Sequence, residues 1–487
     1  MSFDDIVPHE FIEHINNVAS RIVEWAKDGI LFNVYTHLDA DGLAAGGIFA
    51  SILKDLGAPF KVRILNQLTD DIISQMGSHE NCIVVLLDFG SGQRDLLEKS
   101  LKVPCLIIDH HQPKISLHNN NDNNITEVNP HHFGIDGSTQ VSSSGLSYLV
   151  ARTVSEKNVV HSTTAIVGAL GDRQDCGDKA SLIGLNKIFV EEAINNKLLN
   201  VKIGLKLFGF ESRPIVKSLE YTIDPFIPGL SGDFDACMNF LKSIGVPPVD
   251  ENGNFRSMSD LSSDELRKLI IEIVKYMLNH GITSDVAEGM IGTNYILIKE
   301  ASDSCLRDAR EFSSVLNACG RMGNPSYGIA LCMGIRGAIV QRAFEVASKY
   351  RKEISRMLSW FQDNRDKLKS LQYVQYIHLE NNVDERLLST FASILSSSRA
   401  VSMDKPLVCF AFTKSGKIKV SCRADRNLIK RGINLGLASK IAAESVGGIG
   451  GGHDVASGAE IPLNSEEAFL KVFDDVIGKQ VSGASHE

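Results

Sequence analysis

Residues 103–113 read VPCLIIDHHQP, an apolar run that ends in one aspartate and two adjacent histidines. Three other apolar runs precede it, at Leu31–Thr36, Lys61–Leu65 and Ile83–Leu87, with patterns typical of helices between them. Short apolar runs that alternate with helices indicate a parallel sheet covered on both faces. Because ligands bind such sheets at the carboxyl ends of their strands, we expect the chemistry of this chain where these runs end.

Ionisable side chains follow three of the four predicted strands, and one more follows a later predicted helix. They are His37, Asp39, Asp41, Asp88, Asp109, His110, His111 and Asp172. Taken singly, each aspartate has an ordinary structural interpretation as a helix N-cap, a turn residue or a satisfied buried group. Together, so many carboxylates and imidazoles at one sheet edge would repel each other strongly unless cations neutralised them. The set therefore indicates a metal or catalytic site.

The chemistry of these ligands favours particular ions. Carboxylate oxygens with one or two imidazoles suit Mn²⁺ or Mg²⁺, and the lack of thiolates disfavours Zn²⁺ and iron. Five or six ligands are too many for one ion that keeps open positions, so we expect two ions about 3.5–4 Å apart, bridged by a carboxylate. Such a pair generates a hydroxide at neutral pH and stabilises both oxygens of a phosphoryl displacement. The predicted reaction is hydrolysis of a phosphoester or phosphoanhydride.

Composition limits the class of protein. A chain of 487 residues is too long for one compact core and predicts two or three domains. The net charge of −9 argues against a protein that coats nucleic acid, although a local basic channel remains compatible with it. Nine cysteines, none in a C-x-x-C pair, indicate reduced thiols in a cytoplasmic protein. The sequence contains no run of about 18 apolar residues, so we expect no membrane span.

Four motifs and their order resemble the DHH phosphoesterases. The motifs are HLDADG at 37–42, LLDFGSG at 86–92, IDHHQP at 108–113 and GALGD at 168–172. A fifth stretch, GGIGGGHDVASGAEIP at 447–462, looks like the glycine-rich signature of the DHH-associated domain. Residues 208–232 and 307–323 resemble the archaeal RecJ-like proteins. These include a single-strand-specific exonuclease that associates with the GINS replication complex.

The resemblance implies a ligand set for each ion. Asp39 and Asp88 would hold one ion, while Asp41, Asp88, His110 and Asp172 would hold the other. Asp88 would therefore bridge the two ions. From the ligand chemistry we expect two Mn²⁺ ions, with Mg²⁺ as the alternative.

The resemblance also implies roles for the neighbouring residues. His111 would lie beside the scissile phosphate as a hydrogen-bond donor, and Asp109 would orient the imidazoles. The pyrophosphatase branch of the family has a ligand histidine four residues before the first Asp of D-x-D, and this chain has Tyr35 there. His37 resembles the arrangement in some RecJ proteins. It stays open whether His37 is a metal ligand or shapes the strand end.

The rest of the chain predicts two further regions. We expect a DHH catalytic domain over 1–200, a helical linker and inserted region over 201–370, and a smaller α/β DHH-associated domain over 371–487. The middle region contains predicted helices at 262–281 and at about 337–368, and strands are predicted near 372–379, 406–412 and 417–423. The HNNNDNN tract at 118–124 reads as an exposed loop.

The predicted C-terminal domain contains a basic segment beside a glycine run. Residues 417–431, KIKVSCRADRNLIKR, hold six cations and one acid, which is also compatible with a lysine-protected edge strand. The glycines of 447–452 would leave backbone N–H groups open to a phosphate. The candidate substrate-binding residues are Arg423, Gly450, Gly451, Gly452 and His453.

These features predict a two-metal exonuclease whose C-terminal domain grips the substrate. By resemblance the polymer is single-stranded DNA, or RNA, degraded from an end in replication or repair, with GINS and the replicative helicase as partners. One alternative is a phosphoesterase of short oligonucleotides or small molecules, which the large middle region disfavours. The other is a replisome scaffold that binds GINS and has little nuclease activity. The retained Asp39, Asp41, Asp88, His110 and Asp172 disfavour that scaffold.

Overall fold

The structure is a computed structural model that describes residues 7–76, 81–113, 124–210, 212–223, 225–398 and 400–483. The chain divides into two compact units. The first comprises residues 1–218, 251–261 and 291–348, and the second comprises residues 219–250, 262–290 and 349–487. Except for its last residue, the predicted loop at 118–124 lies outside the described residues. The three domain ranges expected from the sequence stay a prediction.

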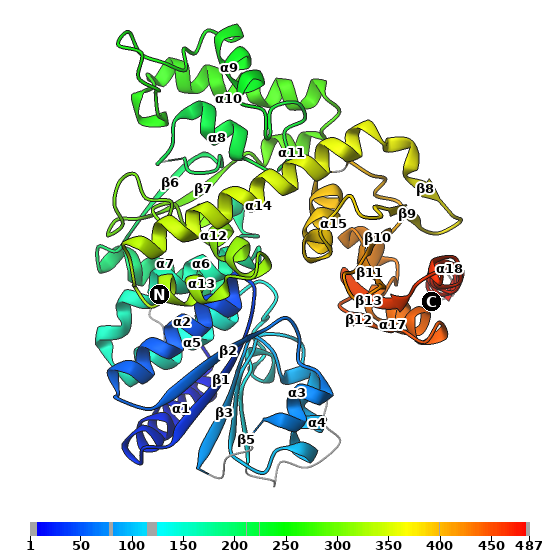
Figure 1. The fold of residues 1–487 in the computed structure, drawn as a ribbon. Coiled ribbons are helices and arrows are strands. Elements are labelled where there is room, and N and C mark those ends of the chain that lie inside the picture. Colours follow the sequence, from blue (N-terminus) through cyan, green and yellow to red (C-terminus); the bar gives the residue numbers. More distant parts are fainter. Residues whose placement is uncertain are drawn as a thin grey trace. The chain divides into compact units, whose positions relative to one another are not determined.

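A five-stranded parallel sheet forms the centre of the first unit (Figure 1). Its strands are β1 Leu31–His37, β2 Phe60–Leu65, β3 Cys82–Leu87, β4 Cys105–Ile108 and β5 Ile125–Val128. They lie in the order β2-β1-β3-β4-β5, and every neighbouring pair is parallel. The four predicted strands and the parallel sheet are confirmed, and β5 is an additional strand. Strands β3 and β4 are buried along their whole length, as expected for apolar runs in the middle of a sheet.

Helices cover both faces of this sheet (Figure 1). One face is covered by α1 His9–Lys27, α2 Ala40–Asp55 and α5 Ser143–Val154. The other face is covered by α3 Asp70–Gln75 and α4 Arg94–Ser100. On that second face, Val84 and Leu86 of β3 share one apolar cluster with Ile73 of α3 and Leu97 of α4. The carboxyl ends of β1, β3 and β4 remain at one edge of the sheet, where the ionisable residues follow.

The remainder of the first unit packs against the helices beside the sheet. It contains α6 Ser162–Gly171, α7 Gly184–Asn195, α12 Ala309–Arg321, α13 Pro325–Cys332 and the antiparallel ribbon of β6 Leu199–Leu205 with β7 Ile291–Leu297. Helix α12 contacts α2, α6 and α13. The ribbon falls partly in the region expected to be helical, so that expectation is wrong for β6 and β7. Strand β7 is buried at six of its seven positions, whereas β6 is buried only at its two ends.

The contact between α12 and the β1–α2 turn depends on Gly320. A β-carbon built on Gly320 would lie 1.7 Å from the carbonyl oxygen of Leu38. We expect Gly320→Ala to lower the free energy of unfolding by about 1–3 kcal/mol, because neither backbone segment can move freely. Thermal unfolding measures this change. Gly92→Ala is the control, since its added β-carbon meets no atom within 4 Å. Equal stability of the two variants would contradict the close approach of α12.

A six-stranded mixed sheet forms the C-terminal part of the second unit. Its strands are β8 Lys369–Ser370, β9 Gln375–His378, β10 Leu407–Phe412, β11 Lys417–Arg423, β12 Ile449–Gly452 and β13 Ala456–Pro462. Their order is β12-β13-β11-β10-β9-β8, and only β9 and β10 are parallel. The predicted strands at 406–412 and 417–423 are confirmed. The glycine run was given no strand from the sequence, yet Ile449–Gly452 is an edge strand paired with β13.

Helices that pack against this second sheet complete its core. Apolar residues of β10 and β11 pack with those of α17 Leu435–Ser445 and α18 Glu466–Gly483. Helix α15 Leu388–Ser397 also contacts β10 and β11, and α16 Arg426–Lys430 follows β11. The α/β fold class with a parallel N-terminal sheet and a smaller C-terminal α/β region is therefore confirmed.

The remaining helices confirm most of the expected helical middle. They are α8 Ile215–Tyr221, α9 Phe234–Ser243, α10 Ser263–Asn279, α11 Ser284–Glu288 and α14 Ala338–Asp363. Helix α10 confirms the helix predicted at 262–281, and Ser262 is its N-cap: the Ser262 hydroxyl accepts from the Glu265 N–H, and the Glu265 carboxylate accepts from the Ser262 N–H. Among the described residues, no helix is both long and apolar enough to cross a membrane.

Candidate metal centre

The turn from β1 into α2 carries the first three candidate ligands. His37 is the last residue of β1, and Asp39 is the N-cap of α2, where its Oδ1 accepts from the Gly42 N–H at 3.0 Å. The other carboxylate oxygen of Asp39, Oδ2, lies 2.8 Å from His37 Nδ1. Asp39 therefore caps the helix and still presents one oxygen to the site. The alternative in which Asp41 acts as the N-cap is wrong.

Asp41 lies in the first turn of α2 and is fully buried. Its two carboxylate oxygens accept from the backbone N–H groups of Ser143, at 2.7 Å, and Ser144, at 3.1 Å. These groups belong to the start of α5, whose N-cap is Ser142. Burial and the nearby Asp88 carboxylate raise the pKa of Asp41 to about 6. A buried carboxylate in such surroundings gains from a cation.

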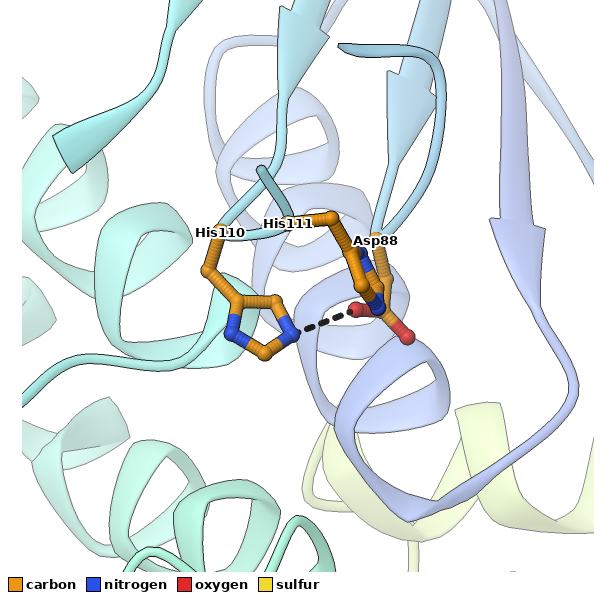
Figure 2. Close-up of side chains that lie close together, drawn as sticks. All are labelled: Asp88, His110 and His111. Carbon is orange, nitrogen blue, oxygen red and sulfur yellow. Dashed lines mark ion pairs between the residues drawn. The ribbon is translucent and has the colours of Figure 1, made fainter. Parts of the chain in front are cut away.

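Asp88 occupies the middle of the cluster, directly after β3. Its φ of 67° is in the left-handed region, which is uncommon for a residue with a side chain. Such backbone strain concentrates at functional sites. The two oxygens of Asp88 approach different imidazoles, with Oδ2 3.3 Å from His37 Nδ1 and Oδ1 3.5 Å from His110 Nε2. Figure 2 shows the Asp88 carboxylate next to the ring of His110.

His110 follows β4 and is oriented by the backbone. Its Nδ1 lies 2.7 Å from the carbonyl oxygen of Gly137, so this nitrogen carries the proton and Nε2 faces the cluster. Nε2 is 3.0 Å from Oδ2 of Asp172, which follows α6 directly. Burial acts to lower the pKa of His110, but Asp172 and Asp88 raise it well above its ordinary value. A carbonyl-oriented imidazole is the usual arrangement of a metal-ligating histidine.

Asp109 and His111 form a separate pair beside this centre. Asp109 is buried, and its Oδ1 lies 2.7 Å from His111 Nδ1, while its Oδ2 accepts from the Ser91 N–H at 3.0 Å. Burial acts to lower the pKa of His111, but Asp109 raises it to about 9. The His111 side chain is 35% exposed, so it is accessible to a substrate. Asp109 therefore holds the ring of His111, whereas the Gly137 carbonyl holds the ring of His110.

The cluster provides candidate ligand atoms in overlapping sets. Three groups each have ligand atoms within 4.8 Å of one another: His37, Asp39 and Asp88; Asp41, His110 and Asp172; and Asp88, His110 and His111. Asp88 Oδ1 and His110 Nε2 are buried, and their contacts with each other and with Asp172 are ion pairs; neither atom makes a well-directed hydrogen bond in the described part of the chain. Burial also raises the pKa of Asp172. Buried carboxylate oxygens and imidazole nitrogens that lack well-directed hydrogen bonds are suitable ligand atoms for divalent cations.

Two residues of α12 also contribute to this site and were given no role from the sequence. Asn317 Oδ1 accepts from the Ala40 N–H at 3.1 Å, between Asp39 and Asp41. Burial acts to raise the pKa of Asp39, but the charges of His37 and Arg321 hold it below its usual range. The stretch 307–323 resembles RecJ-like proteins, and this was the available signal. The stretch lies far along the chain from the DHH motifs, so the sequence did not predict that Asn317 contacts Ala40.

The candidate substrate residues lie in the second unit. The Arg423 guanidinium donates to Ser393 Oγ at 2.8 Å, to the Cys422 carbonyl at 2.7 Å and to the Ser389 carbonyl at 3.1 Å. Gly450, Gly451 and Gly452 lie in β12, and the His453 N–H donates to the Ala456 carbonyl. Within the basic segment, Lys417 pairs with Glu460 at 2.5 Å. The binding role of these residues stays a prediction.

Comparisons with known proteins agree with this arrangement. Residues 32–171 match the N-terminal domain of the DHH family, residues 207–291 the DHH-CID domain and residues 371–479 the DHHA1 domain. An uncharacterized protein of Methanocaldococcus jannaschii is 32% identical over 477 residues, which is 97% of this chain and 99% of the relative.

Two solved structures share the fold across most of this chain. CDC45 from Entamoeba histolytica has a TM-score of 0.66 at 12% identity, with 96% of this chain and 99% of that chain covered. RecJ in complex with Mn²⁺ from Thermus thermophilus has a TM-score of 0.55 at 16% identity, with 96% of this chain and 55% of that chain covered. The chain belongs to the DHH family and has a RecJ-like fold.

Proposed function

We propose that this chain is a two-metal-ion exonuclease that hydrolyses phosphodiester bonds of single-stranded DNA from an end, in replication or repair. One observation carries the proposal: two triads of candidate ligands share the neighbourhood of Asp88, and each of its oxygens approaches a different imidazole. RNA is the second polymer to test. DHH proteins are usually phosphoesterases, and the matched DHH motifs are intact here.

Each triad would hold one ion. His37, Asp39 and Asp88 surround the first position, and Asp41, His110 and Asp172 surround the second. When bound, Mn²⁺ or Mg²⁺ at these positions would activate water and offset the negative charge of the phosphate. Asp88 faces both positions and is the proposed bridging ligand. The buried Asp88 Oδ1, which makes no well-directed hydrogen bond among the described residues, supports this role.

His111 and Arg321 would act on the substrate. With a pKa of about 9, the His111 imidazole is protonated at neutral pH and can donate a hydrogen bond to a phosphate oxygen. Asp109 holds the ring by its Nδ1 and leaves Nε2 to make that contact. Arg321, close enough to lower the pKa of Asp39, would add positive charge near the phosphate. Together these cations bind a dianionic transition state better than its ground state.

A scaffold function is the second candidate, because the fold likeness to CDC45 extends over 99% of that chain. In that case the protein would bind GINS and the replicative helicase and have little nuclease activity. The intact carboxylate and imidazole cluster favours the nuclease.

Digestion of labelled oligonucleotides tests the proposal. The full-length protein is incubated with 5′-labelled or 3′-labelled single-stranded and duplex DNA, and with matching RNA, with and without Mn²⁺. We expect stepwise shortening of the single strand from one end, dependent on the metal, and little cleavage of the duplex. Intact single strands together with binding to GINS would support the scaffold instead. Cleavage confined to di- and trinucleotides would support an enzyme of short oligonucleotides.

The C-terminal domain is expected to grip the strand through phosphate contacts. Arg423→Ala should weaken binding of a long single strand and flatten the slope of log affinity against log salt by roughly 0.7, the value of one phosphate contact. Measured at about pH 8, above the ordinary pKa of histidine, His453→Ala should weaken binding without a change of slope, because the substitution removes no lysine or arginine. Cleavage of a dinucleotide should change much less, because only uniform binding is lost.

Lys417→Ala is the matched control on the same β-strand, β11. Lys417 is already paired with Glu460, so its loss should leave the salt slope unchanged. Fluorescence anisotropy at several salt concentrations provides the slopes. If Arg423→Ala leaves the slope unchanged, the internal bonds of its guanidinium to α15 are its whole role, and the predicted phosphate contact is wrong.

A further inference from the structure

The segment that follows Asp172 contacts the residues that orient the candidate metal ligands. Gln174 is fully buried, and its Nε2 donates to the Gly137 carbonyl at 2.8 Å. That same carbonyl receives Nδ1 of His110 at 2.7 Å. The segment therefore carries one candidate ligand, Asp172, and also steadies the carbonyl that orients another. A shift of this segment would therefore displace both Asp172 and His110, two of the three candidate ligands at the second metal position.

The same segment is held in an unfavourable backbone conformation. Arg173, Lys179 and Ala180 have φ values of 56°, 51° and 53°, all in the left-handed region. Each such residue costs on the order of 1 kcal/mol and persists only where surrounding contacts hold it. The segment 173–180 therefore needs an anchor.

Arg310 of α12 provides this anchor. Its guanidinium donates to Asp175 Oδ2 at 2.6 Å, to the Ala180 carbonyl at 3.3 Å and to the Thr293 carbonyl of β7 at 3.1 Å. One side chain thus fixes the middle and the end of the segment to the ribbon and to α12. Asp175 is 15% exposed and Arg310 is 25% exposed, so water screens the pair only in part. The Nε of Arg310 is buried and has no hydrogen-bond partner among the described residues. Burial of this unpaired N–H costs free energy, which the other three bonds of the guanidinium must offset.

We propose that Arg310 is a positioning residue for the metal centre, which acts through Asp175 and the segment 173–180 on Asp172 and His110. The inference rests on the proposed metal centre. The same helix contacts the other metal-ligand segment, because Asn317 accepts from the Ala40 N–H. Helix α12 therefore ties together two ligand segments that come from distant parts of the chain. Loss of the Arg310 contacts loosens Asp172 and His110 without removal of any ligand.

Metal affinity of the chelator-stripped full-length protein is the appropriate readout. Isothermal titration with Mn²⁺ should show affinity at one position weakened about 10–100-fold in Arg310→Ala, as for other residues that orient metal ligands. Asp175→Asn should have the same effect and should add little to Arg310→Ala, because both act through one contact. Arg310→Lys keeps the charge opposite Asp175 and should recover part of the affinity. On a dinucleotide substrate, kcat should fall while KM changes little.

Arg336→Ala is a closely matched control. The Arg336 guanidinium also bonds to one carboxylate, Glu300, and to two backbone carbonyls, those of Leu331 and Ile335. None of these bonds involves the segment 173–180, so the Mn²⁺ affinity of the variant should equal that of the wild type. If Arg310→Ala fails to fold, Asp175→Asn and Arg310→Lys decide the question.

The possible failures are separable. A wild-type protein that binds no Mn²⁺ overturns the proposed metal centre itself. Wild-type affinity in both Arg310→Ala and Asp175→Asn overturns only the positioning role. An equal loss of affinity in Arg336→Ala also overturns it, because the effect would then be one of general stability.

Discussion

Asp88→Ala is expected to lower kcat by several orders of magnitude while the protein still folds. Asp88 faces both proposed metal positions, so its loss removes a ligand from each ion at once. Alanine tolerates the φ of 67° at this position less well than aspartate, so Asp88→Ala should also lose some stability without losing the fold. The rate of oligonucleotide hydrolysis, measured beside circular dichroism and thermal unfolding, tests the prediction.

Two further variants sharpen the interpretation of Asp88→Ala. Asp88→Asn keeps the shape of the side chain and the tolerance of asparagine for left-handed backbone, yet it removes the charge that binds cations. It should fold like the wild type and be nearly as inactive as Asp88→Ala. Glu192→Gln is the control, because Glu192 pairs with Arg152 in the same unit away from the cluster. A folded Asp88→Ala protein with near-normal turnover would refute the bridging role.

Removal of divalent metal is expected to abolish activity altogether. The candidate ligands are carboxylates and imidazoles without thiolate, so EDTA should inactivate the protein, and Mn²⁺ or Mg²⁺ should restore it. The metal should also stabilise the fold, because it binds the native state. At a metal concentration of 100 times Kd the gain is about 2.7 kcal/mol.

Thermal unfolding with increasing Mn²⁺ measures this gain independently of any substrate. The wild type should melt at a higher temperature as Mn²⁺ is added, and Asp88→Ala should respond much less. Full activity in metal-free buffer, or an equal response of both proteins to Mn²⁺, would contradict the metal centre.

The strands that carry the site were predictable because their sequences are continuous apolar runs. The ends of β1, β3 and β4 share one edge in a parallel sheet, which is why the residues that follow them converge. The exact role of each aspartate was harder to assign. Asp39 and Asp41 are both compatible with capping in sequence, and only the position of the N–H groups at the start of α5 assigns Asp41 to the interior.

Other elements lacked a local signal. Strand β12 consists of one isoleucine and three glycines, and no strand pattern predicts it. Glycine is required there because a β-carbon on Gly450 would lie 2.4 Å from the Ser439 carbonyl of α17. The ribbon of β6 and β7 pairs segments about 90 residues apart, and that separation exceeds the reach of periodicity.

The contribution of α12 to the site could not come from local sequence reasoning either. Ala40 and Asn317 are 277 residues apart, and Asp175 and Arg310 are 135 residues apart. Such contacts are set by the packing of α12 against α2 and α6, which the motifs alone do not specify. The candidate ligands could thus be found from the ends of strands and helices, whereas Asn317, Arg321 and Arg310 of α12 could not.

The number and coupling of bound ions decides most directly whether Asp88 is the centre of a two-metal site. Metal-free full-length protein is titrated with Mn²⁺ and followed by electron paramagnetic resonance, for the wild type and for Asp88→Asn. We predict two Mn²⁺ per wild-type chain, with the spectrum of a spin-coupled pair, and loss of that coupling in Asp88→Asn. A single ion per chain, or two uncoupled ions in the wild type, would contradict the bridged two-metal centre.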